Sequence, residues 1–296
     1  MRALYLLINP HAAGGRARRL LPALQQWAAA RPTPCPICQA DSVAEARQWL
    51  LGLPRGSTVA LVGGDGTVNQ MLPALLANDL QLALIPQGSG NDLARALGLA
   101  GLGWRAALAN VDSGQAQAMD VGWLQTDSER LPFASSLTVG FDSAVGHQAL
   151  RGPRWLRGLP RYLLATLREL WALQTWDLAV WLDGQPLHQG TTLFASTLNT
   201  PSYGSGMPAV PHARLDDGAL DILIAGRFNR LQVLAMLPRL LLGWHLSHPR
   251  VRTQAFSQLR ITAAQPLPLA ADGEYLGSSR DFTLQVAPGA LRVLRP

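Results

Sequence analysis

Lysine is absent from all 296 residues, so the 25 basic side chains are all arginines. A Walker-type phosphate loop needs a lysine beside its glycines, a Schiff-base mechanism needs a lysine amine, and protein kinases carry a lysine on a strand. The sequence therefore excludes these three chemistries. A phosphate-binding site in this chain must depend on backbone N–H groups and on arginine.

Cysteine and charge are also scarce, with two cysteines and 15% charged residues. Cys35 and Cys38 cannot complete a tetrahedral zinc site by themselves, so we expect a structural role for them and a reducing, cytoplasmic setting. The formal net charge of +6 suits an anionic partner such as phosphate or an acidic membrane surface. No helix-turn-helix, zinc-finger or aromatic-stacking signature is present, which argues against a nucleic-acid partner.

Long hydrophobic runs are missing as well. The longest apolar stretch, Leu231–Leu246, is interrupted by Pro238 and Arg239. It falls short of the about 20 residues that a membrane-spanning helix needs. The sequence therefore predicts a cytoplasmic protein that meets a membrane only peripherally.

One segment fits such peripheral contact. Residues 151–162 interleave four arginines with tryptophan and leucine, the mixture that binds at a headgroup boundary. The same spacing also fits a helix that packs Trp155, Leu159 and Tyr162 into a core. The sequence leaves both interpretations open, and it leaves a homodimer open too.

The N-terminal part alternates strands with helices. Buried strands are expected at Ala3–Ile8, Thr58–Val62 and Leu82–Ile85, and helices at Arg16–Ala30, Ser42–Leu51, Val68–Leu76 and Asp92–Leu97. Ser42 and Glu45 have the spacing of a capping box. This βα repeat predicts a mostly parallel sheet with helices on both faces.

After about Val121 the pattern changes to short alternating runs separated by turns such as Asp183-Gly184 and Asp217-Gly218. This pattern is typical of antiparallel β structure. Strands are expected at Phe133–Val139, Leu178–Leu182, Leu193–Thr197, Leu220–Ala225, Gln258–Thr262 and Phe282–Val286, with helices near 159–173 and 231–244. We expect two domains, 1–122 and 123–296, with a cleft between them and the last residues as candidates to return to the first domain.

Two glycine-rich turns have the composition of a phosphate-binding site. The strand at Thr58–Val62 leads into Gly63-Gly64-Asp65-Gly66-Thr67, and the next strand leads into Gly88-Ser89-Gly90-Asn91-Asp92. Glycines let the backbone approach a phosphate closely, and the helix start that follows supplies N–H donors. Two such turns side by side on a parallel sheet would form a phosphate-binding edge.

These turns also carry a family resemblance. Asn9-Pro10 with Gly14-Gly15, GGDGTVNQ (63–70) and PQGSGNDLAR (86–95) resemble the catalytic domain of diacylglycerol kinases, above all the soluble bacterial lipid kinases related to sphingosine and ceramide kinases. Later segments continue the family's order: Asp120-Val121-Gly122, Gly140-Phe141-Asp142-Ser143, Gly204–Pro211, Leu215-Asp216-Asp217-Gly218 and Asp272-Gly273-Glu274. The resemblance implies an α/β N-terminal domain with an NAD-kinase- or phosphofructokinase-like parallel sheet. It also implies a β-rich, antiparallel sandwich-like C-terminal domain that takes the lipid.

The resemblance further implies which residues bind and react. Asp272 would be the general base, with Glu274 beside it and Asp65 as a second catalytic carboxylate. The sequence does not decide whether Asp65 or Asp272 is the base. A structural Mg²⁺ would be held by Asp217 and the backbone oxygens of Arg214 and Ala219, since oxygen ligands suit a hard cation. ATP would contact Asn9, Gly63, Gly64, Asp65, Gly66, Thr67, Asn69, Gly88, Ser89, Asn91 and Asp92.

The function predicted from all this is ATP-dependent phosphorylation of a hydroxyl on diacylglycerol or a related lipid at a membrane surface. Phosphoryl transfer needs positioning, a divalent metal and a carboxylate near the nucleophile, which these residues would supply. Two alternatives stay open. One is a kinase of a soluble acceptor, like NAD kinases, and the other is a catalytically silent nucleotide- or lipid-binding regulator.

Overall fold

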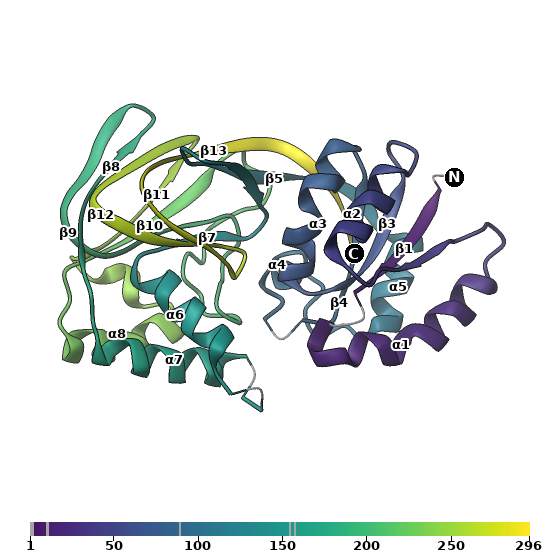
Figure 1. The fold of residues 1–296 in the computed structure, drawn as a ribbon, viewed down its shortest axis with the longest axis horizontal. Coiled ribbons are helices and arrows are strands. Elements are labelled where there is room, and N and C mark those ends of the chain that lie inside the picture. The colour runs from purple at the N-terminus through teal and green to yellow at the C-terminus, as the bar shows by residue number, and fades with distance from the viewer. Residues whose placement is uncertain (1–2, 10–11, 89, 154, 157) are drawn as a thin grey trace. The chain divides into compact units, whose positions relative to one another are not determined.

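The computed structural model describes residues 3–9, 12–88, 90–153, 155–156 and 158–296, and the chain divides into two compact units (Figure 1). Unit 1 comprises Met1–Met119 and Gly289–Pro296, and unit 2 comprises Asp120–Pro288. Strands β5 (Gln115–Gln125) and β13 (Glu274–Arg295) each run from one unit into the other. The last eight residues of the chain therefore belong to the same unit as the first strand.

Unit 1 contains a parallel sheet, as the βα repeat predicts. Its order is β2 (Ile37–Gln39), β1 (Leu4–Ile8), β3 (Thr58–Gly63) and β4 (Gln81–Pro86), and each neighbouring pair is parallel. The end of β13 adds a further parallel strand, because Arg292 and Val293 pair with Gln81 and Leu82 of β4. The strands are buried on both faces, which explains their nearly continuous apolar sequences.

Helices cover this sheet (Figure 1). They are α1 (Ala12–Ala29), α2 (Val43–Leu51), α3 (Asp65–Ala77), the short α4 (Asp92–Ala96) and α5 (Trp104–Ser113). Leu24 of α1 and Leu108 of α5 belong to the cluster formed by one face of the sheet, together with Leu6 and Val62. Alternate strand residues such as Leu7 point to the opposite face, because side chains in a strand alternate.

Unit 2 is antiparallel, as predicted. Its strands are β6 (Arg130–Phe133), β7 (Ser136–Val139), β8 (Trp176–Leu182), β9 (Gln185–Leu198), β10 (Leu220–Gly226), β11 (Val251–Phe256) and β12 (Gln258–Ala271). They run in the order β11-β10-β9-β7-β12-β13, with β8 paired to both β9 and β12. Asp183 and Gly184 join β8 to β9 with φ values of 48° and 81°, which suits the predicted Asp-Gly hairpin turn.

Three helices, which Figure 1 labels, contribute to the core of unit 2. They are α6 (Phe141–Arg151), α7 (Leu159–Trp171) and α8 (Arg230–Leu241), and a short 3₁₀ turn, η1 (His245–Ser247), follows α8. Phe141, Ala165 and Val233 are their buried contributions to a cluster that includes Leu137 and Ile222 from the strands. Within the described part of the chain, no helix is long and apolar enough to cross a bilayer.

The single strand predicted at Phe133–Val139 is wrong. The structure has two strands there, β6 ending at Phe133 and β7 starting at Ser136. The backbone N–H groups of Ala134, Ser135 and Ser136 donate to a side chain, the carboxylate of Asp272. The break therefore belongs to the candidate site.

Candidate functional site

The strand order of unit 1 defines where a ligand fits. Strand β1 lies between β2 and β3, so the chain leaves β1 toward one side of the sheet and later returns on the other. Ligands bind at the carboxyl ends of the strands where the order reverses in this way. Asn9 directly follows β1, and its Nδ2 donates to Oγ1 of Thr67, which follows β3, at 3.1 Å. Two of the predicted nucleotide residues therefore meet at this switch point.

The two glycine turns touch each other. A methyl group placed on Gly64 would lie 2.6 Å from the Cα of Gly88, and one placed on Gly88 would lie 2.7 Å from the Cα of Gly64. A methyl group on Gly63 would meet Thr67 at 2.6 Å. Since real Cβ atoms do not approach other heavy atoms this closely, the packing of these turns requires glycine. The two glycine-rich turns therefore lie side by side, as the sequence predicts.

Asn91 shapes the second turn. It has a left-handed backbone with φ of 55°, a conformation that asparagine tolerates better than most residues. Its Oδ1 accepts from the N–H of Gly88 and its Nδ2 donates to the carbonyl of Gly88, both at 2.9 Å. Ser89, predicted to contact the nucleotide, lies outside the described residues.

Asp65 joins the two turns. Its Oδ2 accepts from the N–H of Asp92 at 2.9 Å, and its Oδ1 accepts from the N–H of Leu93 at 3.2 Å. A carboxylate that receives the first N–H groups of a helix caps it, so Asp65 caps α4 from the start of α3. The sequence placed a catalytic role on Asp65, and the geometry adds a structural one.

The start of α3 is suited to an anion. Gly64 is its N-cap and offers no side-chain acceptor, and Gly66, Thr67 and Asn69 follow in the first two turns. Helix N-terminal N–H groups and the helix dipole both favour a phosphate at such a point. At the second glycine-rich turn, the guanidinium of Arg95 from α4 donates to the carbonyl of Gly90 at 2.8 Å and lies 3.8 Å from the carboxylate of Asp92. These residues therefore fit the phosphates of a nucleotide without any lysine.

In unit 2, Asp272 and Gly273 form the turn between β12 and β13, with φ values of 47° and 88°. The Asp272 carboxylate accepts three backbone N–H groups: Oδ2 from Ala134 at 2.8 Å, and Oδ1 from Ser135 at 2.7 Å and Ser136 at 2.9 Å. The side chain is buried. Three N–H donors stabilise a carboxylate rather than a carboxylic acid and fix its orientation.

Glu274 begins β13 two residues later and is half-buried. Burial raises the pKa of Glu274, and the nearby negative charge of Asp272 raises it further. When the environments of two neighbouring carboxyl groups separate their pKa values, one group can carry a proton while the other accepts one. The predicted catalytic pair therefore lies together in unit 2.

The predicted metal residues Arg214, Asp217 and Ala219 lie in the loop before β10. Oδ1 of Asp217 accepts from the N–H of Ala219 at 3.2 Å, and Nε of Arg214 lies 3.4 Å from Asp216. Burial raises the pKa of Asp221 in the strand that follows; His212 opposes this rise, and the charge of Asp217 adds a smaller increase. In the described residues, no three acidic, histidine or cysteine side chains converge as a metal site. The fit to Mg²⁺ therefore depends on one carboxylate with carbonyl oxygens and water, a ligand set that this ion accepts.

A buried amide connects this loop to Asp272. Asn199, which sequence reasoning missed, donates from Nδ2 to the carbonyls of Asp120 and Ala134, both at 2.8 Å. Asp120 in turn accepts the N–H of Gly218 at 2.7 Å, and Ala134 donates to Asp272. The predicted metal loop and the predicted base are thus parts of one hydrogen-bond network within unit 2.

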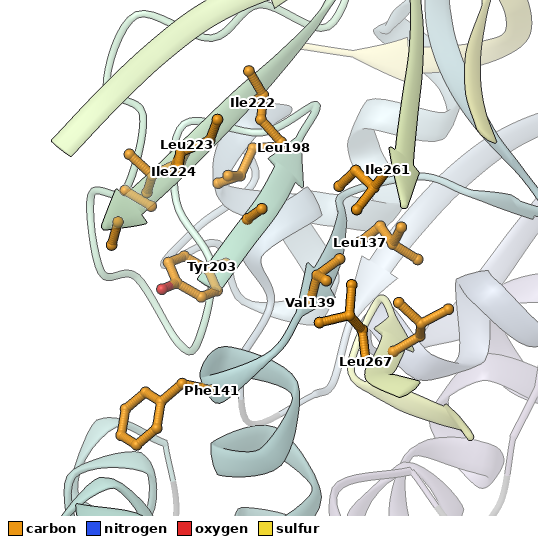
Figure 2. Close-up of a cluster of buried hydrophobic side chains, with 14 of the residues drawn as sticks. Leu137, Val139, Phe141, Leu198, Tyr203, Ile222, Leu223, Ile224, Ile261 and Leu267 are labelled. Atoms are coloured by element: carbon orange, nitrogen blue, oxygen red, sulfur yellow. The ribbon is translucent and has the colours of Figure 1, made fainter. Parts of the chain in front are cut away.

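A further carboxylate, Asp142, was given no role by the sequence, although it stands in the Gly140-Phe141-Asp142-Ser143 motif. Oδ2 of Asp142 accepts from the hydroxyls of Ser196 and Tyr203, both at 2.9 Å. Tyr203 itself lies within the apolar cluster of Figure 2. Desolvation outweighs the two hydroxyl donors and raises the pKa of Asp142 from 3.8 to about 7.

We expect Asp142→Asn to stabilise the protein at high pH. Because the folded-state pKa lies above the unfolded value, the contribution of Asp142 to stability is greatest below pH 3.8, declines between there and about pH 7, and is constant above it. The shift corresponds to at most about 4 kcal/mol. Thermal melts at several pH values should show the variant melting several degrees above the parent at pH 8 and together with it near pH 4. A difference that does not depend on pH would contradict the raised pKa.

Comparison with known proteins identifies the family. Residues 3–124 match the diacylglycerol kinase catalytic domain, and residues 135–295 match the YegS C-terminal NAD kinase beta sandwich-like domain. The chain therefore belongs to the diacylglycerol kinase family of lipid kinases, as its motifs indicate.

Individual relatives agree with this assignment. The chain is 34% identical over 240 residues to the diacylglycerol kinase of Mycobacterium tuberculosis, which covers 80% of this chain and 76% of that protein. It is 26% identical over 242 residues to the diacylglycerol kinase of Bacillus subtilis, covering 81% and 78%.

Solved structures share the fold. A diacylglycerol kinase from Bacillus anthracis matches with a TM-score of 0.72 at 18% identity over 100% of this chain and 97% of that one. An NAD kinase from Archaeoglobus fulgidus in complex with ATP matches with a TM-score of 0.51 at 13% identity over 100% and 93%. The predicted two-part fold is confirmed, with NAD kinases as its more distant neighbours.

Proposed function

We propose that this protein transfers the γ-phosphoryl group of ATP to a hydroxyl of diacylglycerol or a related lipid. The observation that carries the proposal is the contact between Gly64 and Gly88 at the carboxyl ends of β3 and β4, next to the strand-order switch of unit 1. It forms a backbone-lined place for phosphates in a chain without lysine. The lipid acceptor is inferred from the relatives, which are named diacylglycerol kinases.

The proposed role of unit 1 is to bind and orient the nucleotide. The N–H groups at the start of α3 and in the turn around Gly88 would hold phosphate oxygens, and Asn9 would border them through its bond to Thr67. Asp65 links the start of α3 to the start of α4, because its carboxylate accepts the N–H groups of Asp92 and Leu93. Fixed donors of this kind contribute to phosphoryl transfer mainly by positioning and charge stabilisation.

The proposed role of unit 2 is to accept the proton. As the lipid oxygen forms its bond to the γ-phosphorus and the bond to the β–γ bridging oxygen breaks, the hydroxyl proton would pass to the Asp272 carboxylate. The three N–H donors from Ala134, Ser135 and Ser136 hold this carboxylate in one orientation. We assign the base to Asp272 rather than to Asp65 because a second carboxylate, Glu274, lies beside Asp272 and raises its capacity to share a proton, whereas Asp65 caps α4.

Mg²⁺ is proposed at two places. One ion would accompany the ATP phosphates, where it neutralises charge during transfer. The other would be held by Asp217 with the carbonyls of Arg214 and Ala219, keeping several waters. An ion bound there would fix the loop, and the hydrogen bonds through Asp120 and Asn199 would in turn help to fix the position of Ala134, which donates to Asp272.

The first test offers the protein [γ-³²P]ATP and Mg²⁺ with a total lipid extract in one reaction and with NAD in another. We expect label in one lipid and none in NAD. Label in NAD alone would establish the soluble-acceptor alternative. That alternative is supported only by fold similarity to an NAD kinase, with a TM-score of 0.51. ATP binding without transfer to either acceptor would identify a silent binding protein and contradict the proposal.

A further inference from the structure

The solvent side of α8 is apolar along its whole length. Leu231, Leu234, Leu241 and Leu242 are exposed, and Leu231 reaches 77%. Ala235 and Pro238 between them are exposed too. These positions recur at intervals of three and four residues, so they form one stripe of the helix. The buried Val233 marks the opposite, inward side. An amphipathic surface helix normally presents polar residues outward, but on α8 the exposed arginines, Arg230 and Arg239, only flank this apolar stripe.

The solvent side of α7 has the same character. Leu167 and Trp171 are one turn apart and exposed, Trp171 at 86%, whereas Ala165, Thr166 and Leu170 are buried. The guanidinium of Arg230, the first residue of α8, donates to the carbonyl of Trp171 at 2.8 Å. The end of α7 therefore lies beside the start of α8, and both helices follow one edge of unit 2 in Figure 1.

A second tryptophan extends this apolar edge. Trp244 follows α8. Its backbone N–H donates to the carbonyl of Arg239, and the residue is 64% exposed. We call Leu167, Trp171, Leu231, Leu234, Leu242 and Trp244 the α7–α8 surface. Contiguous exposed apolar surfaces of this kind mark sites of association, because leaving them in water is unfavourable.

The charges around this surface are almost all positive. Helices α7 and α8 contain four arginines, Arg161, Arg168, Arg230 and Arg239, and one acidic residue, Glu169. Arg168 and Arg239 are exposed, whereas Glu169 is half-buried, and burial raises its pKa. At the start of α8, Arg227 and Arg250 also line an open pocket of about 550 Å³ with Asn229 and Gln232. The surface thus combines leucine and tryptophan with flanking guanidinium groups.

We infer that the α7–α8 surface docks unit 2 onto an anionic lipid bilayer. Tryptophan and leucine side chains would enter the boundary between headgroups and acyl chains, and the flanking arginines would pair with anionic headgroups. This charge complementarity selects a membrane over a second copy of the chain, whose own α7–α8 surface carries the same positive charge. The inference rests on the proposed function, because a lipid acceptor resides in a bilayer.

Vesicle sedimentation without ATP tests the inference independently of catalysis. The probes are phosphatidylcholine vesicles with and without phosphatidylglycerol. The variant combines Trp171→Ser, Leu231→Ser and Trp244→Ser. The control replaces two exposed leucines of unit 1, Leu51→Ser and Leu102→Ser. We expect the triple variant to bind vesicles about 1,000-fold more weakly, since each of the three side chains contributes about tenfold, and the control to bind like the parent.

A second pair of measurements separates the remaining outcomes. Arg168→Gln with Arg239→Gln should weaken binding only to vesicles that contain phosphatidylglycerol. Light scattering of the parent and the triple variant would show whether the surface joins two chains, and a parent dimer that the triple variant abolishes, without vesicle binding, would overturn the inference. Unchanged vesicle binding by the triple variant would overturn it as well.

Activity distinguishes this inference from the proposed function. On a short-chain diacylglycerol dissolved as monomers, the triple variant should keep the parent's turnover, and on vesicle-embedded diacylglycerol it should lose most of it. Equal loss on both acceptors would contradict a docking role. If no acceptor is phosphorylated by the parent, the proposed function fails while the sedimentation result still stands.

Discussion

Asp272→Asn is expected to lower the turnover number by about 10²–10⁴-fold, the usual contribution of a general base, and to leave the affinity for ATP within a few-fold. The variant keeps the size of the side chain but loses the charged atom that would take the lipid proton. It also turns one carboxylate oxygen into an NH₂ group that faces a backbone N–H of Ala134, Ser135 or Ser136. A loss of about 1–3 kcal/mol in the free energy of unfolding should accompany the loss of turnover. Steady-state kinetics and thermal melts measure the two effects separately.

Asp183→Asn is the matched control. Asp183 occupies the other Asp-Gly hairpin turn of unit 2, also with positive φ, and its Oδ1 accepts from the N–H groups of Ser257 and Gln258 at 3.3 and 2.8 Å. The control should keep full turnover and lose less stability than Asp272→Asn, because Asp183 is exposed and the amide oxygen of asparagine can still accept all the bonds that Oδ1 accepts. If Asp272→Asn kept full turnover, or if both variants lost it equally, Asp272 would not be the base.

Gly64→Ala is expected to disable the nucleotide site. The added methyl group would lie 2.6 Å from the Cα of Gly88, and backbone cannot rotate away as a long side chain can. Either turn must move, so we expect the dissociation constant for ATP to rise at least about tenfold and stability to fall by about 1–3 kcal/mol. Calorimetric titration of ATP and a thermal melt measure both.

Gly103→Ala serves as the control within the same unit. Gly103 is the N-cap of α5 with φ of −64°, and a methyl group there meets no atom within 4 Å. Its stability should stay within about 0.5 kcal/mol of the parent, with ATP affinity unchanged. Normal ATP binding by Gly64→Ala would show that the contact between the two turns does not form the phosphate site.

Local sequence signals predicted much of the fold because they act over a few residues. The cap of α2 illustrates how far they reach: Ser42 accepts the N–H of Glu45 at 3.1 Å as expected, but the Glu45 carboxylate returns to the N–H of Asp41 rather than to that of Ser42. Helix α6 was not predicted at all. It starts directly after β7 at Gly140, which has a positive φ of 77°. A side chain at this position would press against Leu193 and Trp176, which come from other strands.

The candidate site was predicted by residue type and not by contact. Composition and motif indicated Asp65 and Asp272, but their hydrogen-bond partners lie 27 to 28 and 136 to 138 residues away. Asn199 has no neighbouring motif, so only the folded chain shows that it connects Asp120 to Ala134. Periodicity also could not separate core from surface in residues 151–162. In the structure Trp155 is 80% exposed while Tyr162 packs against the core, and Arg154 and Arg157 lie outside the described residues.

The most direct test of the central claim uses one purified acceptor. Dioleoylglycerol in mixed micelles, ATP and Mg²⁺ are incubated with the parent protein and with Asp272→Asn, and the lipid product is identified by mass spectrometry. We predict phosphatidic acid, formed in proportion to the ADP released, from the parent and almost none from the variant. ADP release without a phosphorylated lipid, or equal product from both proteins, would contradict a lipid kinase that uses Asp272 as its base.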